Sequence, residues 1–241
     1  MSKILVLDPG HGGSDPGAVG NGLREKDLTL DICKRIKKYL EASYTGIKVH
    51  MTRTTDKYLS LSQRAQFANN KKADLFVSVH INAGGGTGYE DFIHNSLSNS
   101  STTAKMRDTF HKEVVKEQSF WRNRGKKKAN FAVLRETKMA AILTENGFID
   151  NKNDANKLKS SSYLDKIAKG HAEGIAKALG LKKKSTSSTN KNATTSTKTT
   201  NSKKTFYRVV VGSYTERKNA DAQVARLKKA GFDAFIDVYQ K

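Results

Sequence analysis

Cysteine, proline and long apolar runs are all scarce in this chain of 241 residues. Cys33 is the single cysteine, so an intramolecular disulfide is excluded. No apolar run approaches the roughly 20 residues that a membrane-spanning helix needs, and we expect no span. The run at residues 4–7 is also too short for a secretory signal. We therefore expect a protein that is made in the cytoplasm without a signal peptide.

Acidic residues are few relative to basic ones, and the net charge is +21. Such a charge attracts a polyanion, which could be nucleic acid, an anionic membrane or a phosphate-rich cell-wall polymer. Aromatic residues make up only 8% of the chain, and no helix-turn-helix, zinc-finger or RNA-recognition motif is visible. We therefore do not expect a nucleic-acid-binding protein.

Apolar residues are unevenly distributed along the chain. Residues 1–180 carry most of the apolar runs and predict one folded domain. Residues 181–204 are almost purely Ser, Thr, Asn and Lys, which predicts a disordered linker. Residues 205–241 regain a strand–helix–strand pattern, with strands at 206–211 and 232–239 and a helix that starts at Thr215 or Asn219. A unit that small should not be stable alone.

Short apolar strands alternate with helices in the first domain. We predict strands at residues 4–8, 47–52, 74–80, 89–93, 131–134 and 141–144, and helices at 25–43, 61–70, 101–118 and 163–179. This alternation favours an α/β fold with a mainly parallel sheet. Cys33 falls among apolar positions of the first helix and is interpreted as a buried side chain, with a thiol nucleophile or metal ligand as the alternative.

Residues suited to binding a metal follow the predicted strands. His11 comes after the first strand, in a glycine-rich loop at residues 9–22 that also holds both prolines. His80 ends the strand LFVSVH, Glu145 follows AILT, and Glu25 starts a helix. Sites in open parallel sheets form at the carboxyl ends of strands, and two histidines with a carboxylate suit catalytic zinc. The pattern alone is equally consistent with ordinary hydrogen-bonding roles, because no compact metal-binding motif is present.

Four segments resemble a known family. DPGHGGSDPGAVGNGLREKDLTLDI, RTTDKYLSLSQRAQFANN, DLFVSVHINA and LTENGFIDN resemble, in this order, the zinc-dependent N-acetylmuramoyl-L-alanine amidases of the amidase-3 family. The resemblance covers about residues 3–180 and extends to Bacillus-type sporulation amidases and phage endolysins. It implies a twisted, mostly parallel six-stranded sheet flanked by helices. It does not distinguish a sporulation enzyme from an endolysin, and either would reach the wall after lysis or holin-type release.

The resemblance also implies roles for individual residues. His11, Glu25 and His80 would bind Zn²⁺, and Glu145 would be the catalytic residue. The reaction implied is hydrolysis of the amide between the lactyl group of N-acetylmuramic acid and L-alanine in peptidoglycan. A zinc peptidase acting on wall peptides is the alternative, because its metal ligands could look the same, and a wall-binding protein without catalysis is a third.

Other residues receive weaker predictions. Asn82 lies two positions after His80 and is a candidate for substrate binding, or simply begins the loop. Asp8 is expected to fix a strand end or orient a ligand, and Arg53 and Arg64 to form structural ion pairs or to fix loops. The remaining histidines are assigned to packing or the surface. The basic run at residues 122–136 is interpreted as a solvated face, or alternatively as a groove for anionic glycan or teichoic acid.

The C-terminal segment FYRVVVGSYTERKNADAQVARLKKAGFDAFIDVY resembles one repeat of a SPOR-type peptidoglycan-binding domain. Such domains have two of these halves, whereas this chain has one. The resemblance implies wall binding, and we expect that two chains could pair their halves as a homodimer.

Overall fold

The computed structural model describes residues 2–184, 212–232, 236 and 238. The chain divides into two compact units, residues 1–188 and 189–241. Within the described ranges, no helix is both long and apolar enough to cross a membrane. The predicted linker at residues 181–204 lies mostly outside the described residues, as do the predicted strands at 206–211 and, in large part, 232–239.

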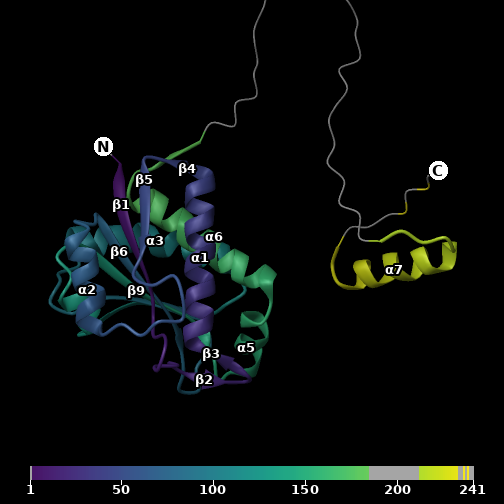
Figure 1. Cartoon of the computed structure of the whole chain (residues 1–241), viewed down its shortest axis with the longest axis horizontal. Coiled ribbons are helices and arrows are strands. Elements are labelled where there is room, and N and C mark those ends of the chain that lie inside the picture. Colours follow the sequence, from purple (N-terminus) through teal and green to yellow (C-terminus); the bar gives the residue numbers. More distant parts are fainter. Residues whose placement is uncertain (1, 185–211, 233–235, 237, 239–241) are drawn as a thin grey trace, which may run out of the picture. The chain divides into compact units, whose positions relative to one another are not determined.

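A six-stranded sheet forms the centre of the first unit (Figure 1). The strand order is β5-β1-β6-β9-β7-β8, and every neighbouring pair is parallel except β7 with β9. The predicted mostly parallel six-stranded sheet is therefore confirmed. The strands are β1 (Lys3–Pro9), β5 (Ile47–Met51), β6 (Leu75–Asn82), β7 (Tyr89–His94), β8 (Asn123–Ala129) and β9 (Ala140–Phe148).

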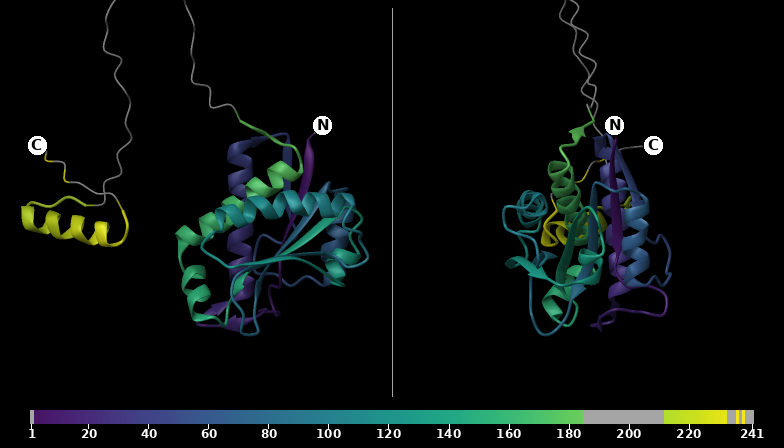
Figure 2. Two further views of the ribbon diagram at one scale, coloured as in Figure 1. Left: turned by 180° about the vertical axis from the view of Figure 1, so that it is seen from behind. Right: turned by 90° about the vertical axis from the view of Figure 1, so that its left-hand side faces the viewer.

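Helices cover both faces of this sheet unequally (Figure 2). The helices α1 (Glu25–Ser43), α3 (Thr102–Glu117) and α6 (Ser161–Ala178) pack together on one face, over the larger apolar core. The opposite face carries only α2 (Leu61–Asn70) and the short α4 (Ala132–Arg135), over a small core that includes Val6, Phe76 and Leu143. His80 and Glu145 share the strand periodicity of Phe76 and Leu143, so they lie on this sparsely covered face.

The sequence signals set the helix boundaries well. Helix α2 begins with a capping box, in which the Ser60 side chain accepts from the Gln63 backbone N–H and the Gln63 side chain accepts from the Ser60 backbone N–H. Helix α1 spans the predicted range and buries Ile32, Cys33 and Ile36. Cys33 is fully buried, and burial raises the pKa of its thiol, as expected for a packing residue.

One predicted strand is wrong. The segment at residues 131–134 forms helix α4, whose Val133 and Leu134 are buried in the small core. The sixth strand is instead β8, within the basic run for which a solvated face is expected from the sequence. Its alternating exposed and half-buried residues, rich in Lys, are typical of an edge strand protected by charge. Neither face of β8 is apolar, so its pattern does not predict a strand.

The smaller elements have no clear signal in the sequence, apart from the C-terminal helix. They are β2 (Val19–Gly20), β3 (Leu23–Arg24), β4 (Tyr44–Thr45), α5 (Lys152–Leu158) and β10 (Lys182–Lys183). Strand β10 pairs with β4, so defined structure continues past residue 180. In the second unit, the predicted helix is α7 (Arg217–Lys229), and none of its residues is buried.

Candidate metal centre

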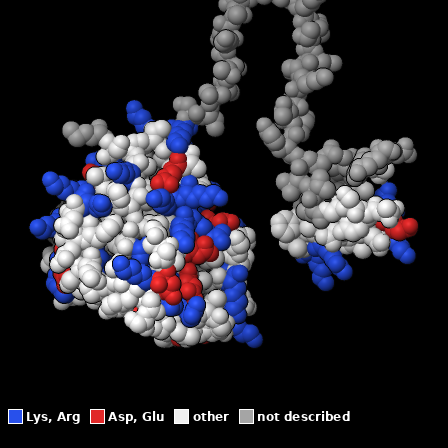
Figure 3. Space-filling model, in the orientation of Figure 1, with Lys and Arg blue, Asp and Glu red and all other residues white. Residues whose placement is uncertain are grey.

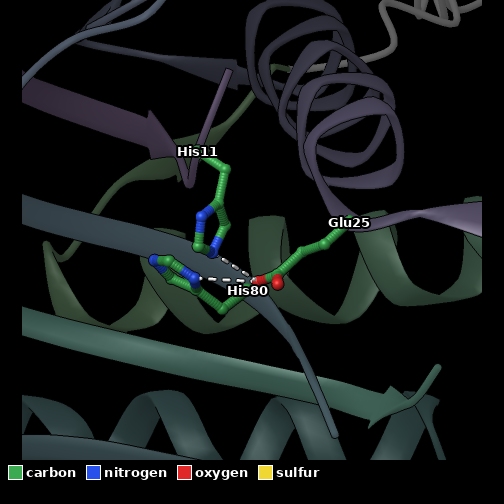
Figure 4. Close-up of side chains that lie close together, drawn as sticks. All are labelled: His11, Glu25 and His80. Atoms are coloured by element: carbon green, nitrogen blue, oxygen red, sulfur yellow. Dashed lines mark hydrogen bonds and ion pairs between the residues drawn. The ribbon is translucent and has the colours of Figure 1, made fainter. Parts of the chain in front are cut away.

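His11, Glu25 and His80 come together at the carboxyl end of the sheet (Figure 4). One ligand atom from each lies within 4.8 Å of the others. Glu25 Oε1 is 3.1 Å from His11 Nε2 and 2.9 Å from His80 Nδ1. The three residues come from the loop after β1, the start of α1 and the end of β6. The sequence-predicted juxtaposition is thus present in the structure.

Hydrogen bonds orient each of these side chains. His11 Nδ1 bonds to Asp15 Oδ2 at 2.8 Å, which leaves Nε2 directed at Glu25. Glu25 accepts from the backbone N–H groups of Ala18 and Ile81, at 2.9 and 3.0 Å. His80 Nε2 is 3.2 Å from the Ser78 hydroxyl. Such outer partners fix ring orientation and tautomer in metal sites.

Two glycines let the backbone approach the three side chains closely. A Cβ on Gly17 would lie 2.6 Å from Glu25 Oε2 and 2.7 Å from the His11 ring, and the φ of Gly17 is +65°. A Cβ on Gly10 would overlap the His80 ring. His11 itself has a left-handed φ of 61°, an uncommon conformation that the surrounding loop must hold in place.

Two buried arginines hold the loop that carries His11. Arg64 donates to Asp8 Oδ1 at 2.9 Å and to the carbonyls of Pro9 and His11, each at 2.7 Å. Arg53 donates to the carbonyls of Pro9 and Gly10, at 3.0 and 2.8 Å. Both therefore fix the loop, as predicted. Asp8 also accepts from Ser78, so it is linked through that hydroxyl to His80.

The three side chains form a strongly coupled electrostatic group. Burial alone would lower the pKa of His11, but its hydrogen bonds and charge interactions with Glu25 and Asp15 raise it to about 9. The pKa of His80 is raised because Glu25 outweighs the effect of burial. Burial opposes ionisation of Glu25, but both histidines hold its pKa far below the usual range. Glu25 is therefore an anion at neutral pH, and its charge favours the protonated forms of His11 and His80.

Glu145 lies beside this group on the neighbouring strand. It is paired with His80 across β6 and β9, so both side chains are on the same face. Burial raises its pKa to about 7. Its Oε2 atom is buried and has no hydrogen-bond partner among the described residues. A carboxyl group with a free oxygen and a pKa near neutrality suits proton transfer.

Comparison with known proteins identifies the family. The sequence profile described as N-acetylmuramoyl-L-alanine amidase matches residues 5–177. The chain belongs to this family. The sporulation-specific N-acetylmuramoyl-L-alanine amidase of Bacillus subtilis (strain 168) is 45% identical over 236 residues, or 98% of this chain and 84% of that protein. The endolysin of Bacillus phage SPP1 is 49% identical over 188 residues, or 77% of this chain and 69% of that protein.

Solved structures agree with the family assignment. The catalytic domain of the amidase CwlV from Bacillus (Paenibacillus) polymyxa var. colistinus superposes with a TM-score of 0.70 at 32% identity, covering 75% of this chain and 99% of that one. A SPOR domain profile also matches residues 172–237. That match begins within α6, whereas the predicted half repeat begins at residue 205.

The structure also places the other residues of this amidase that the sequence analysis names. Asn82 donates to Glu90 Oε1 at 2.9 Å and accepts from the Ala83 backbone N–H, so its amide is engaged within the protein. Its role in substrate binding stays a prediction. The histidines outside the cluster fall into two groups: His50 and His94 are partly exposed, and His111 and His171 are buried in packing roles.

Asp15 is an orienting residue that no sequence prediction included. It holds the His11 ring through Nδ1. Its place four residues after His11, in a glycine-rich loop, is a usable signal for such a partner.

Proposed function

We propose that this chain is a zinc-dependent N-acetylmuramoyl-L-alanine amidase that hydrolyses the amide between the lactyl group of N-acetylmuramic acid and L-alanine in peptidoglycan. The observation that supports the proposal best is the cluster of His11, Glu25 and His80 beside Glu145, in a chain of the amidase family. The relatives named for sporulation and for phage lysis suggest wall degradation during release of a spore or of phage particles.

The donor atoms of the cluster fit zinc. Two imidazole nitrogens and one carboxylate oxygen, all within 4.8 Å of one another, are a ligand set of catalytic zinc sites, which keep a further position open. When bound, zinc would supply Lewis acidity and lower the pKa of coordinated water. His11 and His80 must lose their protons to act as ligands, and Glu25 is already ionised.

Glu145 is proposed as the catalytic acid and base. As the carboxylate, it would take a proton from the attacking water while the water oxygen bonds to the lactyl carbonyl carbon. It would then give that proton to the nitrogen of L-alanine as the amide bond breaks. The products are a free lactyl carboxylate and a peptide with an L-alanine amino terminus. The free oxygen of Glu145 is the group available for both transfers.

Replacing Glu145 by Gln tests this assignment. The variant should bind zinc with unchanged stoichiometry and lose roughly 10²- to 10⁴-fold in rate on purified peptidoglycan. Glu173→Gln is the matched control, because Glu173 lies on α6 over the opposite face of the sheet. Mass spectrometry of the digests should show intact stem peptides beginning with L-alanine. Stem peptides that are shortened but still attached to the glycan would favour the zinc peptidase. A fully active Glu145→Gln variant would refute the role of Glu145.

The second unit is proposed to bind the wall and to pair with a second copy. The SPOR match supports wall binding, and α7 has no buried residue in the unit as described. The apolar face of α7, which includes Val224 and Leu227, is only half-buried, and an amphipathic helix gains stability when a partner covers such a face more fully. Sedimentation of the full chain should show a dimer, and Leu227→Asp, on α7, should shift it to a monomer while the amidase rate on soluble fragments stays unchanged. A wild-type chain that stays monomeric at high concentration refutes pairing.

Teichoic acids are proposed as additional partners on the wall. The net charge of +21 supports this, and Lys and Arg are spread over the visible faces of both units (Figure 3). Binding to walls should weaken as salt is raised, and more steeply for walls that carry teichoic acid than for walls stripped of it. Equal salt dependence on the two walls would contradict this proposal.

A further inference from the structure

A row of charged side chains continues from the metal centre toward the edge of the sheet. His80 on β6 is paired with Glu145 on β9, and Glu145 is paired with Glu90 on β7. Residues paired across strands point to the same face. Beyond Glu90, on the edge strand β8, Arg124 Nε donates to Glu90 Oε2 at 2.6 Å. The row therefore runs over four neighbouring strands on the sparsely covered face.

Glu90 is the buried anchor of this row, and its carboxylate is fully engaged. Its side chain is 5% exposed, and Arg124 and Lys127 both donate to Oε2 at 2.6 Å while Asn82 donates to Oε1. One carboxylate thus faces two cations, which leaves an excess of one positive charge. The neighbouring Lys126 does not contribute to this excess, because it pairs with Asp108 at 2.8 Å.

The Arg124 guanidinium is held rigidly but is only partly used. Its Cζ lies 4.8 Å from the centre of the Phe148 ring, and Nε is bonded to Glu90. No hydrogen bond joins its two terminal nitrogens to another described residue, and the side chain is 28% exposed. A guanidinium fixed by stacking and by one ion pair, with a free pair of donors, is suited to bind a carboxylate in a bidentate manner.

We propose that Arg124 binds a carboxylate on the peptide side of the bond that Glu145 hydrolyses. This inference rests on the proposed function. The muramic acid carboxyl group is consumed in the scissile amide, so the nearest free carboxyl groups belong to the peptide. L-alanine is followed by a glutamate linked through its side chain, whose α-carboxyl group is either free or a carboxamide. Arg124 would select the free carboxylate.

The spacing of the row agrees with this assignment. Neighbouring strands are about 4.8 Å apart, so the Glu90 end of the Arg124 side chain lies on the order of 5 Å from the strand of Glu145. Two extended peptide residues cover about 7 Å. The α-carboxylate of the glutamate, the second stem residue, can therefore reach Arg124 while the scissile amide before L-alanine lies at Glu145. The peptide would then run toward β8.

The experiment compares two solubilised peptidoglycan preparations, one with the free α-carboxylate at the second stem residue and one with the carboxamide. The wild type should cleave the carboxylate form with roughly tenfold higher kcat/KM, the size expected for hydrogen bonds to a charged group. Arg124→Gln should slow only the carboxylate form and so remove the preference, mainly through KM. Arg124→Lys should restore part of it. Lys126→Gln, the same change of charge on the same strand, should keep it.

The outcomes distinguish failure of the Arg124 inference from failure of the proposed amidase function. Equal wild-type rates on the two substrates overturn the inference and leave the amidase function intact, and this comparison needs no variant to fold. An Arg124→Gln variant that slows both substrates alike overturns it too, because a purely structural ion pair predicts that result. A wild type that cleaves neither substrate overturns the proposed function itself.

Discussion

Buried His171 should make the stability of the first unit depend on pH. It lies on α6, donates from Nδ1 to the Ile167 carbonyl at 2.8 Å and has Nε2 3.1 Å from the Thr144 hydroxyl. The neutral ring therefore has a hydrogen-bond partner at each nitrogen. Burial lowers the pKa of His171 from 6.5 to about 4. Among the described residues, no carboxylate is hydrogen-bonded to this ring to favour the charged form.

The direction of the effect follows from the two protonation states. Above pH 6.5 the ring is neutral in the folded and unfolded chains, and its contribution to stability is complete. As the pH falls below 6.5, His171 becomes protonated in the unfolded chain, whereas in the folded protein it stays neutral until the pH nears 4. Stability is lost over that window. The difference between these two pKa values corresponds to about 3 kcal/mol.

The assay is urea unfolding of the wild type and of His171→Gln from about pH 8 to about pH 4, in the presence of a chelator so that metal binding does not contribute. Fluorescence of Trp121, the one tryptophan, reports the first unit. The introduced glutamine does not titrate, so the wild type should lose about 3 kcal/mol more than the variant across the window. Any packing defect adds a constant offset and cancels in the comparison. A pH-independent difference between the two free energies of unfolding would refute the reasoning.

Three further predictions concern the metal centre. Gly17→Ala should weaken zinc binding at least roughly tenfold in a competition titration, because its Cβ would displace the Glu25 carboxylate and the left-handed backbone would be strained; unchanged affinity would contradict so close an approach of the backbone. Zinc binding near pH 7 should release a proton from His11 and a further contribution from His80, as measured by calorimetry in buffers of different ionisation enthalpy; no buffer dependence would contradict the raised pKa values. Arg64→Ala should cost about 3–5 kcal/mol in urea unfolding, because it leaves the buried carboxylate of Asp8 without its ion pair; a loss below about 1 kcal/mol would contradict that pairing.

Much of the fold could be predicted from local patterns in the sequence. The strand that carries His80 is a continuous apolar run, and the helix beginning at Glu25 has apolar residues at helical spacing, so both are marked by the sequence. The edge strand β8 could not be found, because an edge strand with charged residues on both faces has no apolar alternation. The apolar segment at residues 131–134 is ambiguous by its nature, since four such residues fit one helical turn as well as a strand.

The candidate site shows the same division. The juxtaposition of His11 and His80 follows from parallel topology, which places the ends of β1 and β6 at one edge. The Arg124–Glu90 pair depends on the register between β7 and β8, which contains a bulge, and residues 34 positions apart give no sequence signal of their contact. For Arg124, the sequence indicates only that it belongs to the basic run at residues 122–136.

The hydrogen bonds from Arg53 and Arg64 to the His11 loop affect how the enzyme responds to loss of its metal. In small zinc domains the metal is the reason that the chain folds, so chelation unfolds them. Here hydrogen bonds from Arg53 and Arg64 hold the backbone of the loop, and Asp15 orients the His11 ring, so these contacts are made by protein groups and not by the metal. Chelation should therefore leave a folded, inactive protein, and returning the metal should restore activity without a refolding step. Metal supply would then act as a reversible on-switch for wall lysis.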